Sequence, residues 1–302
     1  MNQQFLTELK AVTAENRIFT DEPMKKHTTF RVGGPADILV QPKGTELAAV
    51  IRLCRKYDVP YQVIGNGSNL LVGDRGIRGL VIEMLSKEDE ICVEDDCITV
   101  GAGMLLSKTA NRAAEHGLTG MEFAAGIPGR IGGAVVMNAG AYGGEMKDIL
   151  TAVTVLDQEG NEKIFSAEEL ELGYRTSCIL KKGYIVMGAK IKLKHGEETA
   201  IRARMEELKK QRVEKQPLEY PSAGSTFKRP EGYFAGKLIM DAGLRGYLVG
   251  EAQVSEKHCG FVINRGNATA ADVRTLMQNV ADIVEEKFGV RLEPEVKMIG
   301  EF

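Results

Sequence analysis

The sequence has no arrangement of cysteines or histidines that would indicate a disulfide framework or a metal site. Its five cysteines are an odd number and include no C-x-x-C pair, which predicts free thiols in a reducing compartment. The four histidines, His27, His116, His195 and His258, are spaced unlike any common set of metal ligands. We therefore expect no metal centre.

Two further absences narrow the function. No stretch approaches the roughly 20 apolar residues of a membrane helix, and the first residues carry charges where a signal peptide would have an apolar block. The net charge is only -3, so no strong positive field favours a nucleic acid. These features predict a cytoplasmic protein that neither enters a membrane nor binds nucleic acid.

Hydrophobic spacing predicts helices and strands in no regular alternation. A helix capped by Thr45 follows a strand at 36–42, a hairpin turns at 159–161, and a final strand covers 290–299. Helical patterns cover residues 3–16, 104–116, 197–215, 234–242 and 269–288. Such a mixture favours an α+β fold over a doubly wound parallel sheet.

The composition changes near residue 196, where a strongly charged helical pattern begins. A chain of 302 residues is long enough for two domains. We therefore predict a first region at 1–195, with subdomains of about 1–75 and 76–195, and a second domain at 196–302.

Glycine is abundant, at 34 residues, and two segments are rich in it. GNGSN at 65–69 lies between two predicted strands, so it is not the Rossmann turn, which opens a helix. Its backbone N–H groups can form an anion-binding nest, although a tight hairpin turn is the alternative. GIPGRIGGAVVMNAGAYGGE at 126–145 places Pro128 before a short helix whose glycines permit close approach. Tight packing is the alternative there, but together the segments favour nucleotide binding.

These two segments resemble the flavin domain that the UDP-N-acetylenolpyruvoylglucosamine reductase family shares with the vanillyl-alcohol-oxidase group. Further matches select the reductase family: HTTFRVGGPAD at 27–37, GYRTS at 173–177, SAGSTFKRP at 222–230 and LEPEVKMIG at 292–300. The resemblance covers essentially the whole chain. It implies an FAD-binding fold of the vanillyl-alcohol-oxidase type, built of two α+β subdomains, and a C-terminal α+β substrate-binding domain.

The resemblance also implies the reaction. Non-covalent FAD would take a hydride from NADPH and pass it to UDP-N-acetylglucosamine enolpyruvate, giving UDP-N-acetylmuramate for peptidoglycan. A monomer is expected. The cofactor-binding positions implied are Ile64, Gly65, Asn66, Gly67, Ser68, Asn69, Leu70, Gly126, Ile127, Pro128, Ile131, Gly132, Gly133, Asn138, Ala139, Gly140, Arg212 and Lys297.

The catalytic positions implied by the resemblance are Ser225, Arg175 and Glu295. Ser225 matches the proton donor, because hydride transfer leaves an enolate-like carbon that must be protonated. Arg175 matches an arginine whose planar fork suits a carboxylate, and Glu295 matches an active-site glutamate. Alternatively, Ser225 is an ordinary loop hydroxyl, Arg175 forms a surface salt bridge and Glu295 is a charge on an edge strand. Ser222 is a nearby rival for the role of Ser225.

Lys215, Lys228 and Arg229 match positions for the nucleotide-sugar. Arg229 stands where one branch of the family has asparagine, and the chain lacks that branch's tyrosine loop between Arg175 and Lys215. It therefore resembles the shorter branch, which leaves open how the UDP end is covered. Two rival functions are a flavin oxidase of the same fold and a nucleotide-sugar sensor without catalysis. The serine and glutamate motifs argue against the former, and the three intact catalytic positions argue against the latter.

Overall fold

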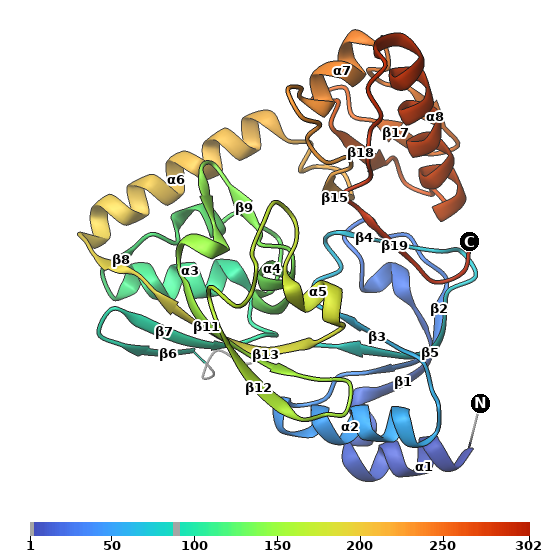
Figure 1. Ribbon diagram of the computed structural model, residues 1–302. Coiled ribbons are helices and arrows are strands. Elements are labelled where there is room, and N and C mark those ends of the chain that lie inside the picture. The colour runs from blue at the N-terminus through green and yellow to red at the C-terminus, as the bar shows by residue number, and fades with distance from the viewer. Residues whose placement is uncertain (1–2, 87–90) are drawn as a thin grey trace. The chain divides into compact units, whose positions relative to one another are not determined.

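The computed structural model describes residues 3–86 and 91–302 (Figure 1). Its contacts divide the chain into two compact units. Unit 1 comprises Met1–Phe19, Ile38–Gly65 and Gly79–Arg212, and unit 2 comprises Thr20–Asp37, Asn66–Arg78 and Val213–Phe302. Both units combine helices with β-sheet, so the predicted α+β class is confirmed. The domain boundary at residue 196 stays a prediction, because units defined by packing do not show where a domain can be separated.

Unit 1 contains an antiparallel five-stranded sheet in the order β12-β11-β13-β7-β6 (Figure 1). The short helix α4 packs against β13 and β7, which places the second glycine segment on this sheet. The strands are β6 (Ile91–Glu94), β7 (Cys97–Gly101), β11 (Leu150–Leu156), β12 (Glu162–Ser166) and β13 (Ile185–Lys192), and the helices of this part are α3 (Leu106–Glu115), α4 (Ile131–Val136) and α5 (Cys178–Lys182).

A second sheet has the order β1-β2-β5-β3, with β3 and β5 parallel. Helices α1 and α2 pack against each other in unit 1 (Figure 1), and their apolar faces contribute Phe5, Leu9, Leu47 and Ile51 to its core. The bounds are α1 (Gln3–Val12), β1 (Ile18–Pro23), β2 (Pro35–Val40), α2 (Gly44–Lys56), β3 (Tyr61–Ile64) and β5 (Ile77–Glu83).

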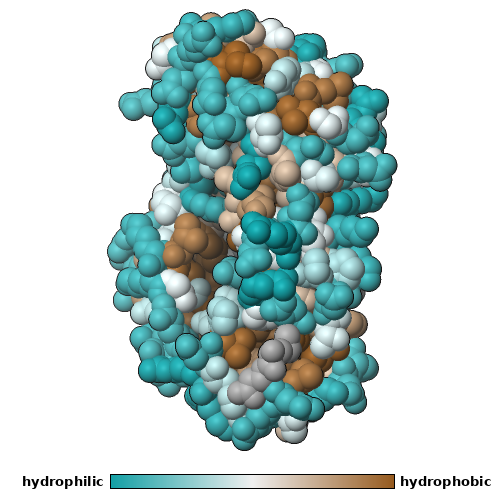
Figure 2. All heavy atoms as spheres, turned by 90° about the vertical axis from the view of Figure 1, so that its right-hand side faces the viewer, coloured by the Kyte–Doolittle hydropathy of each residue, from teal (hydrophilic) through white to brown (hydrophobic). Residues whose placement is uncertain are grey.

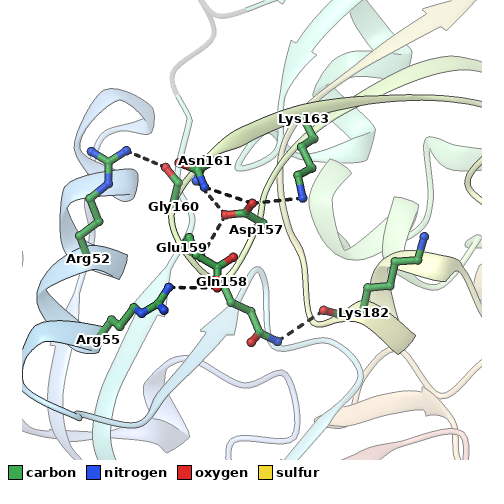
Figure 3. Close-up of polar contacts among 9 residues, drawn as sticks. All are labelled: Arg52, Arg55, Asp157, Gln158, Glu159, Gly160, Asn161, Lys163 and Lys182. Atoms are coloured by element: carbon green, nitrogen blue, oxygen red, sulfur yellow. Dashed lines mark hydrogen bonds and ion pairs between the residues drawn. The ribbon is translucent and has the colours of Figure 1, made fainter.

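The predicted hairpin between β11 and β12 is confirmed, and its turn is held by a buried carboxylate (Figure 3). Asp157, 4% exposed, accepts hydrogen bonds from the backbone N–H groups of Glu159 and Asn161 at 3.0 and 2.8 Å. Arg52 of α2 donates to the Gly160 carbonyl at 3.0 Å. The bonds that Asp157 accepts, from the Asn161 N–H first and also from Lys163 and the Glu159 N–H, hold its pKa down at about 2.

Unit 2 is built on the antiparallel sheet β15-β18-β17-β16, against which helix α8 packs (Figure 1). A two-stranded parallel sheet joins β4 to β19. Phe30, Val32 and Leu71 lie in the same core as Val273 and Leu276 of α8, so early segments of the chain complete this unit. The bounds are β4 (Leu70–Val72), β15 (Ser222–Ser225), α7 (Ala235–Asp241), β16 (Leu248–Val249), β17 (Ala252–Val254), β18 (Phe261–Asn264), α8 (Ala270–Phe288) and β19 (Lys297–Ile299).

The remaining regular elements are short, apart from the long helix α6 (Glu198–Lys215). They are the strands β8 (Leu118–Thr119), β9 (Gly140–Ala141), β10 (Gly144–Glu145) and β14 (Lys194–His195), and the 3-10 helices η1 (Glu15–Arg17), η2 (Met24–Lys26), η4 (Glu122–Ala124) and η5 (Met146–Asp148). Strand β9 pairs with β10 immediately after α4.

Two details of the sequence prediction were wrong. Thr45 does not cap α2: the helix begins at Gly44, and the N–H of the preceding Lys43 donates to the Glu46 carboxylate at 2.9 Å. The final strand covers only 297–299, because Pro294 has no N–H to donate to a continuous ladder.

Helix α8 follows the predicted pattern at its N-terminus. The Thr269 side chain accepts from the Asp272 N–H at 3.0 Å, forming a capping box. The carboxylate of Asp74, far away in the sequence, accepts from the N–H groups of Ala270 and Ala271 at 2.8 and 2.9 Å. The loop after β4 therefore ties down the start of this helix.

The surface in Figure 2 is mostly hydrophilic, with separate apolar patches. Among the helices of the described residues, none combines the length and apolarity needed to cross a membrane.

Candidate active site

In unit 2, the first glycine turn packs too closely on neighbouring backbone for any other residue at Gly67. Its φ is +60°, and a Cβ there would lie 2.0 Å from the His27 carbonyl oxygen. The next residues return to regular pairing, because the Lys297 N–H donates to the Asn69 carbonyl at 2.9 Å. The Asn69 side chain donates to the Glu295 carbonyl at 3.0 Å. The turn is thus fastened directly to the segment that carries Glu295.

Ser225 ends β15 and is exposed, whereas the next residue, Thr226, is fully buried. The Thr226 hydroxyl accepts a hydrogen bond from the Val262 N–H at 2.9 Å, and the backbone N–H of Thr226 donates to the Gly260 carbonyl at 2.9 Å. The register between β15 and β18 shifts between Ser222 and Ser225. Thr226 therefore holds the end of β15 in place beside β18, and Ser225 at this end is exposed.

Glu295 lies on a segment bonded to that same edge. Its N–H donates to the Thr226 carbonyl at 2.8 Å, so Ser225 and Glu295 lie on neighbouring backbone segments of one unit. Glu295 is half-buried, and Glu293 is exposed. Glu293 pairs with Lys228 at 2.9 Å, which lowers the pKa of its carboxyl group. Residues two apart share one face of a regular strand, so the different exposure of the two glutamates does not come from strand alternation; the regular strand begins only at Lys297.

The other basic positions of unit 2 lie around these segments. Arg229 stacks its guanidinium over the Phe234 ring, 3.9 Å from the ring centroid. Lys215 is the exposed last residue of α6, and Lys297 is exposed on β19. Among the described residues, no cluster of histidine, cysteine, aspartate or glutamate could hold a metal ion.

In unit 1, the two adjacent glycines of the second segment have different environments. A Cβ at Gly132 would lie 3.1 Å from the Ala102 Cβ, and the Gly132 N–H donates to the Ala102 carbonyl at 2.8 Å. A Cβ at Gly133 would meet nothing within 4 Å. Gly132 thus serves backbone packing, while Gly133 leaves bare backbone on which a flat group could lie.

Two half-buried arginines accompany this segment, and burial lowers the pKa of both. Arginine keeps its charge at neutral pH even so. Arg130 donates from Nη1 to the Gly103 carbonyl at 2.6 Å, and its buried Nε has no hydrogen-bond partner within residues 3–86 and 91–302. The Arg212 guanidinium lies against Gly126, 2.9 Å from where a Cβ would be. An orphaned donor beside bare glycine backbone fits an anionic dinucleotide such as FAD.

Arg175 lies in a tight turn of unit 1 in which Gly173 and Thr176 form an isolated antiparallel bridge. The arginine adopts the left-handed conformation, with a φ of +55°. Its Nη2 lies 3.5 Å from the Gly140 carbonyl oxygen. The turn therefore brings Arg175 to the glycine segment.

Sequence reasoning missed three supporting residues: Thr226, Arg130 and Ser177. All three occur inside motifs already noted, but a motif does not show which of its side chains point inward. Ser177, the last residue of GYRTS, is fully buried and donates to the Val136 carbonyl at 2.7 Å.

Comparison with known proteins defines the class first. A family model described as an FAD binding domain matches residues 36–166, which defines the class as FAD-binding proteins. A second, the C-terminal domain of UDP-N-acetylenolpyruvoylglucosamine reductase, matches residues 216–299. A UDP-N-acetylenolpyruvoylglucosamine reductase of Agathobacter rectalis is 57% identical over 100% of both chains, and one of Caldanaerobacter subterraneus is 52% identical over 100% of both. The chain belongs to the UDP-N-acetylenolpyruvoylglucosamine reductase family.

Solved structures agree with this assignment. The reductase of Thermus caldophilus is 41% identical, with a TM-score of 0.78, and the alignment covers 91% of this chain and 97% of that one. An alkyldihydroxyacetonephosphate synthase, at 14% identity and a TM-score of 0.51 over 98% of this chain and 61% of its own, shares the fold alone. The predicted flavin fold is confirmed, and family membership decides against the flavin oxidase and the sensor.

Proposed function

We propose that this chain reduces UDP-N-acetylglucosamine enolpyruvate to UDP-N-acetylmuramate with Ser225, Arg175 and Glu295 as its catalytic residues. Bound FAD supplies the chemistry of carrying a hydride from NADPH to the enolpyruvyl group, a step of peptidoglycan synthesis. The observation that carries the proposal is the placement of Ser225 and Glu295 on directly bonded segments of unit 2, in a chain of this family.

Ser225 supplies the proton that the substrate carbon needs after the hydride arrives. A serine hydroxyl is a weak acid, but a carbon with enolate character is a strong base, so position matters more than acidity. Ser225 is exposed at the end of β15 while its neighbour Thr226 is locked in place. The hydroxyl can therefore face a substrate without moving the strand.

Arg175 holds the substrate carboxylate and withdraws charge as the enolate develops, because a guanidinium fork matches a carboxylate in two hydrogen bonds. Glu295 orients the substrate or polarises the donor from the same backbone edge as Ser225. Lys215, Lys228 and Arg229 are proposed to contact the nucleotide-sugar. Lys228 is already paired with Glu293, so it would have to exchange that partner.

FAD is proposed to bind non-covalently to the two glycine segments, with Gly133 offering bare backbone and Arg130 and Arg212 offering positive charge. The predicted cofactor-binding positions in unit 2 are residues 66–70 and Lys297. Backbone groups of Ala139 and Gly140 can also contribute, whereas the predicted Asn138 is fully buried and uses its amide within the protein.

The protein is further proposed to act as a cytoplasmic monomer that contributes to cell shape and division through the cell wall. Its five free thiols suit a reducing compartment. The molar mass of the holoenzyme, measured by light scattering, tests whether the protein is a monomer. Fractionation of the source cells tests whether it is cytoplasmic.

Replacing Ser225 by alanine tests the catalytic assignment. Stopped-flow absorbance of the flavin separates reduction by NADPH from reoxidation by the sugar. We expect reduction to stay near normal and reoxidation to slow by about 10²-fold or more, the usual contribution of a positioned acid. Ser222→Ala on the same strand is the matched control and should change little. The assignment is wrong if Ser225→Ala reoxidises at the parent rate or if Ser222→Ala is the slow variant.

A further inference from the structure

The turn that carries Arg175 cannot be stable by itself. Its two backbone hydrogen bonds join Gly173 and Thr176 reciprocally at 3.1 and 3.3 Å. Arg175 and, just before the turn, Glu171 both adopt positive φ, at +55° and +48°, a left-handed conformation that is unfavourable for a residue with a Cβ. Contacts from outside the turn must therefore hold it in place.

Asn138 provides the central contact. Its side chain is fully buried, and its Nδ2 donates to the Gly173 carbonyl at 3.1 Å and to the Glu145 carboxylate at 2.7 Å. Its Oδ1 accepts from the Lys147 N–H at 2.9 Å. One amide thus joins the start of the arginine turn to the segment that follows the second glycine run.

Ser177 fastens the other end of the turn. Its buried hydroxyl donates to the carbonyl of Val136 at the end of α4, at 2.7 Å. Asn138 and Ser177 therefore hold the turn at both ends against two positions of one short stretch, 136–138. Arg175 in between approaches the Gly140 carbonyl. The orientation of its guanidinium depends on both tethers.

We infer that Asn138 is a positioning residue, which acts through Arg175 by holding the arginine turn, with Ser177 as its second tether. This inference rests on the proposed role of Arg175. The Asn138 side chain does not reach substrate or cofactor, because it is 0% exposed and its amide is used within the protein. Asn138 itself has a φ of +44°, which asparagine tolerates better than most residues.

Asn138→Gly is the informative variant, because glycine keeps the left-handed backbone and removes only the amide. We expect reoxidation by the sugar to slow by about 10-fold or more, since small misplacements of a binding group are costly. The rate of flavin reduction by NADPH should stay within about twofold of the parent rate, because the sugar carboxylate that Arg175 is proposed to bind takes no part in this step. The apoprotein's affinity for FAD, measured by quenching of flavin fluorescence, should be unchanged. Asn138→Asp keeps the shape but places a second carboxylate beside Glu145, and should slow the same step.

Asp157→Asn is the matched control. It weakens another hydrogen-bonded turn of unit 1 (Figure 3), and it should lower the melting temperature without changing either half-reaction. A loss of reoxidation rate in this variant equal to that in Asn138→Gly would show a general effect of instability and overturn the inference.

A double-mutant cycle with Arg175→Ala decides how Asn138 acts. If it acts through Arg175, Asn138→Gly should slow reoxidation further by less than about twofold once the arginine is gone. Fully additive losses, or a loss of FAD affinity in Asn138→Gly, would overturn the inference and leave the proposed function intact. If Arg175→Ala alone reoxidises normally, the proposed role of Arg175 fails, and the inference fails with it.

Discussion

The two parts of the proposed site are held in place by different means. In unit 2, Ser225 and Glu295 are placed chiefly by backbone bonds, from the Glu295 N–H to the Thr226 carbonyl and from the Lys297 N–H to the Asn69 carbonyl, and the side chains of Thr226 and Asn69 add to them. In unit 1, the turn of Arg175 is tethered by the side chains of Asn138 and Ser177. Backbone bonds form with almost any sequence, whereas a side-chain tether disappears with one substitution. The arginine part should therefore be the more sensitive to mutation.

The sharpest test of this comparison replaces Arg175 by lysine. Lysine keeps the charge but is a point donor without the planar fork. We expect reoxidation by the sugar to slow by about 10²-fold, the order found when one transition-state donor is removed. Reduction by NADPH should be unaffected. Stopped-flow absorbance measures both steps, and a lysine variant with a normal reoxidation rate would show that charge alone suffices.

A smaller effect is expected in unit 2 from Thr226→Val. Valine has the shape of threonine, but it leaves the buried N–H of Val262 without its acceptor. The free energy of unfolding should fall by about 1–3 kcal/mol, measured by urea denaturation. Reoxidation should change by less than about threefold, because the backbone bonds that place Ser225 and Glu295 remain. A large loss of reoxidation rate would mean that side chains control both parts and would remove the contrast.

The smallest expected effects come from pH, and they differ between the units. Burial lowers the pKa of His258, and its Nδ1 accepts from the Gly260 N–H at 3.2 Å. The folded state therefore favours neutral His258, and this contribution is lost as pH falls below the ordinary value of 6.5. Asp157 of unit 1, with its pKa at about 2 against an ordinary 3.8, loses its contribution only as pH falls from about 4 toward 2.

Melting temperatures recorded across pH check this ordering. His258→Gln should flatten the decline between about pH 7 and pH 5, and Asp157→Asn should flatten the decline only below about pH 4. Equal slopes for the parent and His258→Gln in the upper range would contradict the assignment of that decline to His258.

Much of the fold and of the candidate site could be predicted from local pattern. The helical pattern at 269–288 located α8 (Ala270–Phe288) to within a residue, and the glycine at 160 marked a real hairpin turn. The cap at Thr45 was wrong because Glu46 offers its carboxylate to the residue before the helix, and sequence alone does not rank such competing bonds. The tether roles of Asn138 and Ser177 could not be foreseen, since no local sequence pattern specifies that they bond the Gly173 and Val136 carbonyls.

The order of synthesis matters for unit 2. Its core needs Phe30 and Leu71, its helix α8 is tied to Asp74, and β4 pairs with β19 at residues 297–299. A ribosome adds roughly 5–20 residues per second, so residues 20–37 and 66–78 wait for many seconds until their last C-terminal partners emerge. A gene fragment that encodes only residues 213–302 should yield an unfolded polypeptide, and one that stops before residue 297 should yield a target for proteases.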